Sequence, residues 1–386
     1  MRRSDERILT SHVGSLPRPA AVLDAYAQGL ADDELEAVLR RAVSDVVARQ
    51  QEIGIDIVND GDVGKPMSTE IDYGAWSSYS YGRMSGFEMQ EVPIGFVGKD
   101  REEFAEFYAS GEVPIWAPGR LRRVGVAVRA IEYVGQAQIQ RDVENLTAAL
   151  GSTPPESAFV AAVSAGYAEA PRPTGSFYAT VEEEAVAAAE ALREEYRAIT
   201  DAGLSVQLDD PYLVNLYEFT YSLDGDMKSF RKWAERHIEL VNHSLEGIPE
   251  ESVRYHVCWG SWKGPHSSDL PIKDVLDLIV EVRASLYSVE AANPQHEHEW
   301  RAWRDVKLPE GRSVMPGVVT HKTNILEHPE VVADRLVRYA QVVGRENVVA
   351  GTDCGMGGRI HPQLAWAKLK VLAEGAALAS RELWGS

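Results

Sequence analysis

The residues of this chain most able to do chemistry are a histidine, two cysteines and a glutamate that close short apolar segments. His256 and Cys258 are two positions apart, and side chains at i and i+2 of a strand point to the same face. Cys354 opens a glycine-rich turn after a second apolar segment, and Glu290 ends a third. Imidazole, thiolate and carboxylate groups are ligands that Zn²⁺ accepts in tetrahedral sites. The pattern therefore predicts a Zn²⁺ site made by His256, Cys258, Glu290 and Cys354.

The number of cysteines narrows the interpretation of this pattern. The chain has two cysteines in 386 residues, so disulfide bonds do not hold the fold together. A buried cysteine often acts only as a small apolar side chain, and the spacing alone leaves that alternative open. The position of all four groups at strand ends favours the metal. A catalytic ion is favoured over a structural one, because a large domain folds without a metal and structural zinc sites are richer in cysteine.

The ligand types indicate which reaction such a centre would serve. Thiolates donate electron density to the ion, so a zinc centre of this kind is a poor Lewis acid for splitting water. It remains able to hold a substrate thiol as its thiolate near neutral pH. A bound thiolate attacks electrophilic carbon. The predicted reaction class is therefore S-alkylation, the transfer of an alkyl group from a donor to a small-molecule thiol.

Alternating apolar segments and amphipathic helices must position these groups. The apolar segments are typical of strands buried on both faces of a parallel sheet, and they lie at 8–15, 55–60, 157–164, 204–208, 254–259, 286–290, 314–320 and 347–352, with a weaker ninth candidate at 124–133. Helical spacing of apolar residues is clearest at 33–51, 182–200 and 329–343. This alternation predicts an α/β fold, a (β/α)8 TIM barrel, with a doubly wound sheet as the alternative.

One long segment, at about 64–123, interrupts the alternation after an early strand. It is rich in aromatic residues and glycine and contains Arg83. Long insertions of this kind are typical of a lid or a dimer arm, and a surface-packing excursion is the alternative. No linker divides the chain. We therefore expect a single zinc-binding (β/α)8 barrel domain over residues 1–386 that carries this insertion as a lid.

Composition excludes several classes of partner and location. The chain has 39 Lys+Arg and 59 Asp+Glu, a formal net charge of −20, whereas binding to nucleic acid or an anionic membrane needs a basic surface. The hydrophobic fraction of 45% excludes a disordered chain. No apolar segment is long enough to span a bilayer, and the first residues do not form a signal peptide. We expect a cytoplasmic enzyme that acts on small molecules.

Taken in order, seven short segments identify a family. They are 13–19, 60–62, 207–211, 256–258, Glu290, 316–318 and 353–355. As a set they resemble the catalytic barrel of the cobalamin-independent methionine synthases, within the uroporphyrinogen decarboxylase-like and methionine synthase-like barrels. In style they are most similar to short single-barrel members such as the epoxyalkane:coenzyme M transferases. The resemblance implies a (β/α)8 fold, Zn²⁺ on the four residues named above, a thiol acceptor and an alkyl donor, and it leaves a homo-oligomer open.

The resemblance also implies substrate-binding residues. Ser15 would help to hold the acidic group of the acceptor, and Asp209 would face the amino group of a homocysteine-like thiol. Asp62 stands where the synthases have a glutamate that contacts the same amino group. Arg18 stands where they have an uncharged residue, and it could pair with an extra anionic group on the acceptor. Both departures weaken a simple homocysteine assignment.

Proton transfer is the part of the mechanism that the resemblance leaves most open. His321 lies one place out of register with the proton-handling histidine of the synthases, and Lys322 follows it. We take both as candidate catalytic residues, with a hydrogen-bonded loop histidine as the alternative for His321. The polar motif at 296–300, His-Glu-His-Glu-Trp, we interpret as a solvated face or at best a wall of the pocket.

Three further functions compete with zinc-dependent methyl transfer. An epoxide-opening thiol transferase of the coenzyme M type would need an acid near the developing alkoxide, from His321, Lys322 or a tyrosine of the insertion. A metal-free lyase, similar to uroporphyrinogen decarboxylase, is less favoured. A non-catalytic zinc- or thiol-binding module needs neither lid nor acceptor pocket. The net charge and the single barrel also count against a polyglutamylated folate donor.

Overall fold

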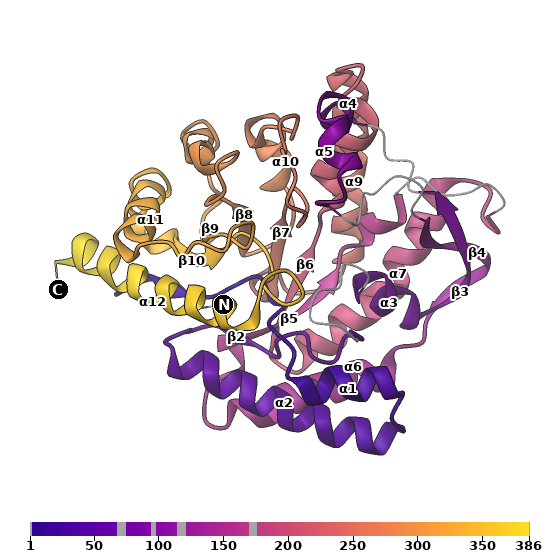
Figure 1. Ribbon diagram of the computed structural model, residues 1–386, viewed down its shortest axis with the longest axis horizontal. Helices are drawn as coiled ribbons and strands as arrows, with labels where there is room; N and C mark the ends of the chain where they lie inside the picture. The colour runs from indigo at the N-terminus through magenta and orange to yellow at the C-terminus, as the bar shows by residue number, and fades with distance from the viewer. Residues whose placement is uncertain (1, 68–74, 94–97, 114–120, 170–175, 386) are drawn as a thin grey trace.

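A closed parallel sheet forms the centre of the molecule in the computed structural model, which describes residues 2–67, 75–93, 98–113, 121–169 and 176–385 (Figure 1). Its strands are β1 (Leu9–Thr10), β2 (Val58–Asn59), β5 (Ala158–Val163), β6 (Ser205–Asp209), β7 (Val253–Val257), β8 (Leu286–Glu290), β9 (Ser313–Val319) and β10 (Val349–Thr352). The order in this eight-stranded sheet is β1-β10-β9-β8-β7-β6-β5-β2, and each pair is parallel. The backbone N–H groups of Asp56 and Ile57 donate to the Thr10 carbonyl at 3.1 and 3.0 Å, so the two ends of this order meet. The predicted (β/α)8 barrel is confirmed.

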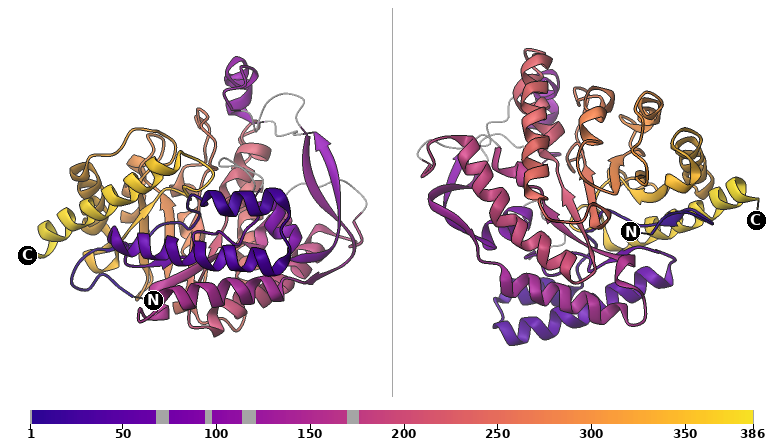
Figure 2. Two further views of the ribbon diagram at one scale, coloured as in Figure 1. Left: turned by 60° about the horizontal axis from the view of Figure 1, so that its bottom comes forward. Right: turned by 180° about the vertical axis from the view of Figure 1, so that it is seen from behind.

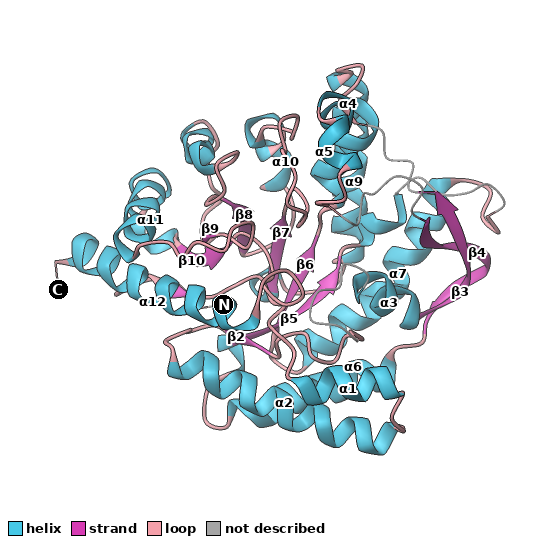
Figure 3. Cartoon of the chain, viewed as in Figure 1, coloured by secondary structure: helices cyan, strands magenta, loops and turns pink. Residues whose placement is uncertain are grey.

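Helices surround the sheet and follow most of its strands (Figure 3). They are α1 (Ala20–Gln28), α2 (Asp32–Glu52), α6 (Gln136–Leu150), α7 (Val181–Asp201), α8 (Tyr212–Leu216), α9 (Met227–Ser244), α10 (Leu276–Ile279), α11 (Pro329–Val343) and α12 (Pro362–Trp384). Sequence signals account for their ends. The Thr180 hydroxyl caps α7 by accepting from the backbone N–H of Glu183 at 3.1 Å, and Pro329 occupies the first turn of α11, where a missing N–H is harmless.

Two layers of buried apolar side chains hold the barrel together. The larger layer lies between the strands and the helices, and the strand β5 is buried along its full length. The smaller layer fills the inside of the barrel with Leu9, Val13, Ile57, Phe159, Leu286, Met315 and Val349. Arg254 also lies inside, with its guanidinium 3.6 Å from the centroid of the Phe159 ring. An apolar floor of this kind leaves the carboxyl ends of the strands for polar groups.

The predicted insertion forms its own small structure beside the barrel (Figure 2). Its described elements are α3 (Ala75–Gly82), β3 (Met84–Pro93), α4 (Lys99–Glu103), α5 (Ala105–Ala109) and β4 (Leu121–Tyr133), while residues 68–74, 94–97 and 114–120 lie outside the described part. The strands β3 and β4 pair antiparallel in a two-stranded sheet. The weak ninth strand candidate at 124–133 belongs to this hairpin and not to the barrel.

Within the described ranges, no helix combines the length and the apolar character needed to cross a bilayer.

Candidate metal centre

Three side chains at strand ends converge on one point. His256 lies on β7, Cys258 is the first residue after β7, and Cys354 is the second residue after β10. Each offers one ligand atom, and these atoms all lie within 4.8 Å of one another. His256 and Cys258 face the same side because they are two residues apart in extended backbone. The three residues could therefore hold one metal ion.

The two ring nitrogens of His256 have different surroundings, and this difference tests the fit of a metal. Nδ1 lies 3.0 Å from the Ser288 hydroxyl on the neighbouring strand β8. Nε2 is buried and has no hydrogen-bond partner among the described residues. A hydrogen bond to one nitrogen orients the ring and leaves the other nitrogen for a metal. A buried, unpartnered nitrogen next to two thiols fits Zn²⁺.

The two thiols also interact with each other. Cys258 is buried and Cys354 is partly exposed. The hydrogen bond between them lowers the pKa of Cys354 well below its ordinary value and raises the pKa of Cys258. The Ser261 hydroxyl lies 3.4 Å from Cys354 Sγ. The site therefore favours the thiolate form of Cys354, which is the form that binds metals.

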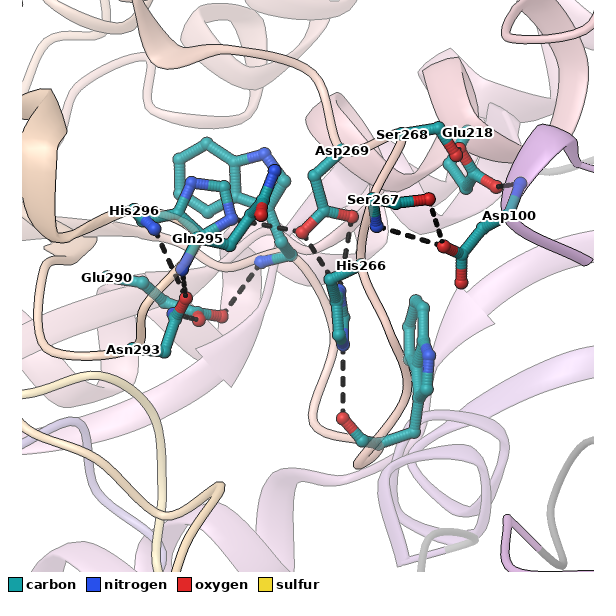
Figure 4. A network of polar contacts seen from close by, with 12 residues as sticks. Asp100, Glu218, His266, Ser267, Ser268, Asp269, Glu290, Asn293, Gln295 and His296 are labelled. Atoms are coloured by element: carbon teal, nitrogen blue, oxygen red, sulfur yellow. Dashed lines mark hydrogen bonds and ion pairs between the residues drawn. The ribbon is translucent and has the colours of Figure 1, made fainter. Parts of the chain in front are cut away.

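Glu290 lies at the end of β8 but is not part of the three-residue cluster. Its Oε1 accepts from the backbone N–H of Trp259 at 2.9 Å, and its Oε2 accepts from the Asn293 amide at 2.5 Å. Lys322 Nζ lies 3.0 Å from the same Oε2. Figure 4 shows Glu290 and Asn293 facing each other. A role for Glu290 as fourth ligand stays a prediction.

The two candidate proton-transfer residues have opposite surroundings. His321 is 1% exposed, and neither of its ring nitrogens has a hydrogen-bond partner among the described residues. Burial lowers the pKa of His321 to about 4, so its ring is neutral near pH 7. Burial also lowers the pKa of Lys322, but Glu290 together with the charges of Asp269 and Asp353 outweighs this effect and raises it above its ordinary value. The catalytic roles of both residues stay predictions.

Asp353 joins two of the strand ends that carry the centre. Its Oδ1 accepts from the backbone N–H groups of Ala291 and Ala292 at 2.7 and 2.9 Å. Asp353 directly precedes Cys354, and Ala291 directly follows Glu290. The carboxylate therefore ties the residue before one candidate ligand to the residues after another.

Ser15 and Arg18 lie in the turn after β1, against the turn that follows Cys354. The Ser15 carbonyl accepts from the backbone N–H groups of Met356 and Gly357, both at 2.8 Å. Arg18 is buried and donates to Ser15 Oγ at 2.7 Å and to the Asp62 carbonyl at 2.6 Å. The hydrogen bonds of the Arg18 guanidinium within the described residues thus go to hydroxyl and carbonyl oxygens. These contacts join the turns after β1, β2 and β10 at one edge of the sheet.

The two predicted contacts for an amino group are not equivalent. Asp62 Oδ1 forms an ion pair with Lys65 Nζ at 2.9 Å, and the lysine also donates to the Ala161 carbonyl at 2.7 Å. Asp62 has a φ of 58°, a left-handed conformation that is uncommon for residues other than glycine. Asp209 Oδ1 accepts from the Gln207 amide at 2.8 Å, and burial raises the pKa of Asp209 to about 7.

The sequence interpretation of residues 296–300 as a solvated face is wrong for His296 and Glu299, which are buried, whereas His298 is exposed. His296 is 1% exposed, and its Nδ1 lies 2.8 Å from Glu299 Oε2. Its Nε2 lies 3.0 Å from Asp269 Oδ2 (Figure 4). Burial lowers the pKa of His296, but these two carboxylates raise it to about 9. Its ring stacks on Trp259, with centroids 4.1 Å apart. The spacing of His296 and Glu299, three residues apart, was a sequence signal for their contact. The second partner, Asp269, is distant in sequence and gave no such signal.

Three further residues that support the site carried no recognisable sequence signal. They are Lys65, Ser288 and Ser261, which contact Asp62, His256 and Cys354, respectively.

Comparisons with known proteins support the family and the fold. The family model described as "Cobalamin-independent synthase, Catalytic domain" matches residues 176–377, more than half of the chain. A 2-hydroxypropyl-CoM lyase of Xanthobacter autotrophicus is 23% identical, covering 99% of this chain and 98% of the lyase. A methionine synthase of Thermococcus kodakarensis is also 23% identical, covering 97% and 94%. A solved B12-independent methionine synthase from Shewanella sp. W3-18-1, in complex with selenomethionine, has a TM-score of 0.72 at 20% identity, covers 98% of this chain and 100% of that chain, and shows the same fold.

Proposed function

The chain belongs to the cobalamin-independent synthase catalytic-domain family, and we propose that it transfers an alkyl group, most simply methyl, to the sulfur of a small thiol. The observation that carries this proposal is the convergence of His256, Cys258 and Cys354, whose ligand atoms lie within 4.8 Å of one another. The buried, unpartnered Nε2 of His256 supports it, because such an atom is costly without a ligand. Family members with this fold act in thiol-related alkyl transfer.

The residues of the cluster would hold a zinc ion as permanent ligands. Zinc in this position would stabilise the acceptor sulfur as a thiolate near neutral pH. Ser288 holds the His256 ring so that Nε2 faces the thiols, and Ser261 keeps Cys354 in place. The ring of His321 lies within electrostatic range of Cys354, and because burial keeps it neutral near pH 7 it could act there as a hydrogen-bond donor or acceptor. The thiol acceptor and the alkyl donor would be the only small-molecule partners.

Epoxide opening by an anionic thiol is the second candidate. Two observations favour it over transfer to an amino-acid thiol. The Asp62 carboxylate is already paired with Lys65 at 2.9 Å, which leaves Asp209 alone to meet an amino group. The Arg18 guanidinium is bound by hydroxyl and carbonyl oxygens and so retains a positive charge for an acidic group. A metal-free lyase has no use for the open nitrogen of His256 beside two thiols.

X-ray absorption at the zinc edge tests the proposal directly. We expect purified protein to contain one zinc per chain, with one nitrogen and two sulfur ligands from the protein. Addition of the correct thiol from a panel that includes homocysteine and 2-mercaptoethanesulfonate should add one sulfur to the zinc shell. The acceptor that does so also decides between the two candidates.

Two variants make this test specific. Cys258→Ser should lose the zinc, whereas His298→Ala removes an exposed histidine outside the cluster and should retain it. Protein that contains no zinc, or zinc that is unchanged in Cys258→Ser, would refute the proposed centre. Zinc that gains no sulfur from any thiol would refute thiolate activation.

A further inference from the structure

The loop that follows Cys258, residues 259–268, contacts the candidate metal centre from one side. One polar contact reaches a residue of the cluster, Ser261 Oγ to Cys354 Sγ (3.4 Å). Two more reach residues beside it, Trp259 N to Glu290 Oε1 (2.9 Å) and His266 Nε2 to Lys322 Nζ (3.5 Å). His266 has a φ of 55°, so the loop is held in a conformation that costs energy at this position. The surroundings of the centre therefore depend on what keeps this loop in place.

The far side of the same loop is bound by the insertion (Figure 4). Asp100, in α4, is 3% exposed. Its Oδ1 accepts from the backbone N–H of Ser267 at 2.9 Å and from the Ser267 hydroxyl at 2.7 Å. Its Oδ2 accepts from the Tyr108 hydroxyl in α5 at 2.6 Å. Hydrogen bonds to a carboxylate are about twice as strong as those between neutral groups.

A second carboxylate reinforces this contact from a third segment. Glu218 follows β6 and α8; its Oε1 accepts from the backbone N–H of Asp100 at 3.2 Å, and its Oε2 accepts from the Ser268 hydroxyl at 2.6 Å. Apolar packing surrounds the polar contacts, because Tyr108 and Val113 of the insertion pack with Trp262 of the loop. Trp262 in turn stacks on His266, with ring centroids 4.5 Å apart.

These contacts form a continuous path from the insertion to the centre. Asp100 holds Ser267, and Ser261 of the same loop contacts the cluster residue Cys354. The neighbouring His266 contacts Lys322, which pairs with Glu290 beside the cluster. The loop starts directly after Cys258, so a shift of residues 259–268 would also move this candidate ligand.

We infer that Asp100 is a positioning residue: it clamps the loop after Cys258 against the metal centre and so sets how tightly the centre holds its ion. The inference rests on the proposed function in one respect, that the cluster holds a metal. The role assigned to the insertion is thus to shape the centre from a distance, without supplying a ligand.

The test compares three variants of the full chain. Asp100→Ala removes all three acceptor contacts, Asp100→Asn retains an acceptor oxygen for Ser267, and Glu102→Ala changes an exposed residue of the same helix. Hydrogen–deuterium exchange reports the loop, with a peptide from α2 as internal reference. Release of zinc to a chromophoric chelator reports the centre, and the spectrum of the cobalt-substituted protein reports its thiolate ligands.

For Asp100→Ala we expect about 10-fold faster exchange in residues 259–268, because contacts to a charged group are lost, with unchanged exchange in α2. Zinc release should be several-fold faster and the thiolate-to-cobalt absorption should change. Asp100→Asn should restore most of both properties, and Glu102→Ala should resemble the unmodified protein. If Asp100→Ala does not fold, Ser267→Ala removes one contact from the other side and should accelerate exchange in the same segment by a smaller factor.

Two results would overturn the inference. One is exchange in residues 259–268 that is unchanged in Asp100→Ala and Ser267→Ala. The other is faster loop exchange with zinc release and a cobalt spectrum that match the unmodified protein. Absence of zinc or cobalt binding in the unmodified protein refutes the proposed function instead, and the exchange measurement separates that outcome from failure of the clamp.

Discussion

Two pairs of buried histidines lie near the same strand ends and differ in the hydrogen-bond partners of their ring nitrogens. In His256 and His321, three of the four ring nitrogens have no hydrogen-bond partner among the described residues. In His266 and His296, all four ring nitrogens have partners. Buried polar atoms are almost always satisfied in folded proteins, so open nitrogens indicate where a ligand enters. Saturated nitrogens indicate a structural network. We therefore propose that the first pair takes part in the chemistry and that the second pair supports it.

The largest effect is expected from removal of a histidine whose two ring nitrogens both have hydrogen-bond partners. His296→Ala leaves the buried carboxylates of Asp269 and Glu299 without their shared partner. Breaking a buried charge pair from one side costs about 3–5 kcal/mol, and we expect a loss of that size in the free energy of unfolding by urea. Protein that still folds should retain one zinc per chain. Loss of zinc with unchanged stability would reverse the assignment of the two pairs.

Removal of a histidine with an unpartnered ring nitrogen should affect zinc binding more than stability. We expect His256→Ala to weaken zinc binding by more than about 100-fold, because changes in residues that only support a metal ligand already cost about 10–100-fold. Competition with a chromophoric chelator measures this change. The variant should unfold with the m value of the unmodified protein. Zinc affinity within a factor of two of the unmodified protein would exclude His256 as a ligand.

The fully hydrogen-bonded His296 also predicts that the stability of the protein depends on pH. The pKa of His296 is raised to about 9 in the folded protein, above the value of about 6.5 in an unfolded chain. Its contribution to stability is therefore complete below pH 6.5 and is lost as the pH rises through 9. We expect the free energy of unfolding to fall by about 2 kcal/mol between pH 7 and pH 10.

The control for this pH dependence is His296→Gln. Its stability should change less over the same interval, because the titrating ring is gone. Parallel curves for the two proteins would show that another group is responsible.

The smallest effect is expected from removal of the Ser288 hydroxyl, which orients the His256 ring. Ser288→Ala removes the 3.0 Å contact to His256 Nδ1 but leaves the ring in place. We expect zinc affinity to fall by about 10-fold, at the lower end of the range for such supporting residues. Ser285→Ala, immediately before the same strand and away from the cluster, serves as the matched control. An equal loss in both variants would indicate a general effect on β8.

Local patterns were sufficient to predict the barrel and the convergence of the three ligand candidates. Buried parallel strands read as continuous apolar segments, and two residues at i and i+2 on one strand must share a face. The strands β1 and β2 are shorter than predicted, because side chains bind backbone groups that would otherwise form hydrogen bonds between the strands. The Asp56 carboxylate accepts from both the backbone N–H and the hydroxyl of Thr10.

Partners from distant segments account for what the sequence could not reveal. Glu290 was predicted from its strand end, yet its oxygens meet groups from 259, 293 and 322, and no spacing rule connects these positions. Residues 296–300 are polar in composition whether they face solvent or a buried network. Only the position of Asp269 decides between the two, and it comes from the loop after β7.

The carboxylate of Asp353 has a consequence for the thermodynamics of binding. Because it ties the residues after Glu290 to the residue before Cys354, two strand ends share one rigid frame before any ligand arrives. A site that is already ordered loses little conformational entropy when it binds. Metal uptake should therefore be fast and should show a small entropic penalty in calorimetry. The protein would then behave as a preassembled receptor, whose order is set by folding and not by its ligand.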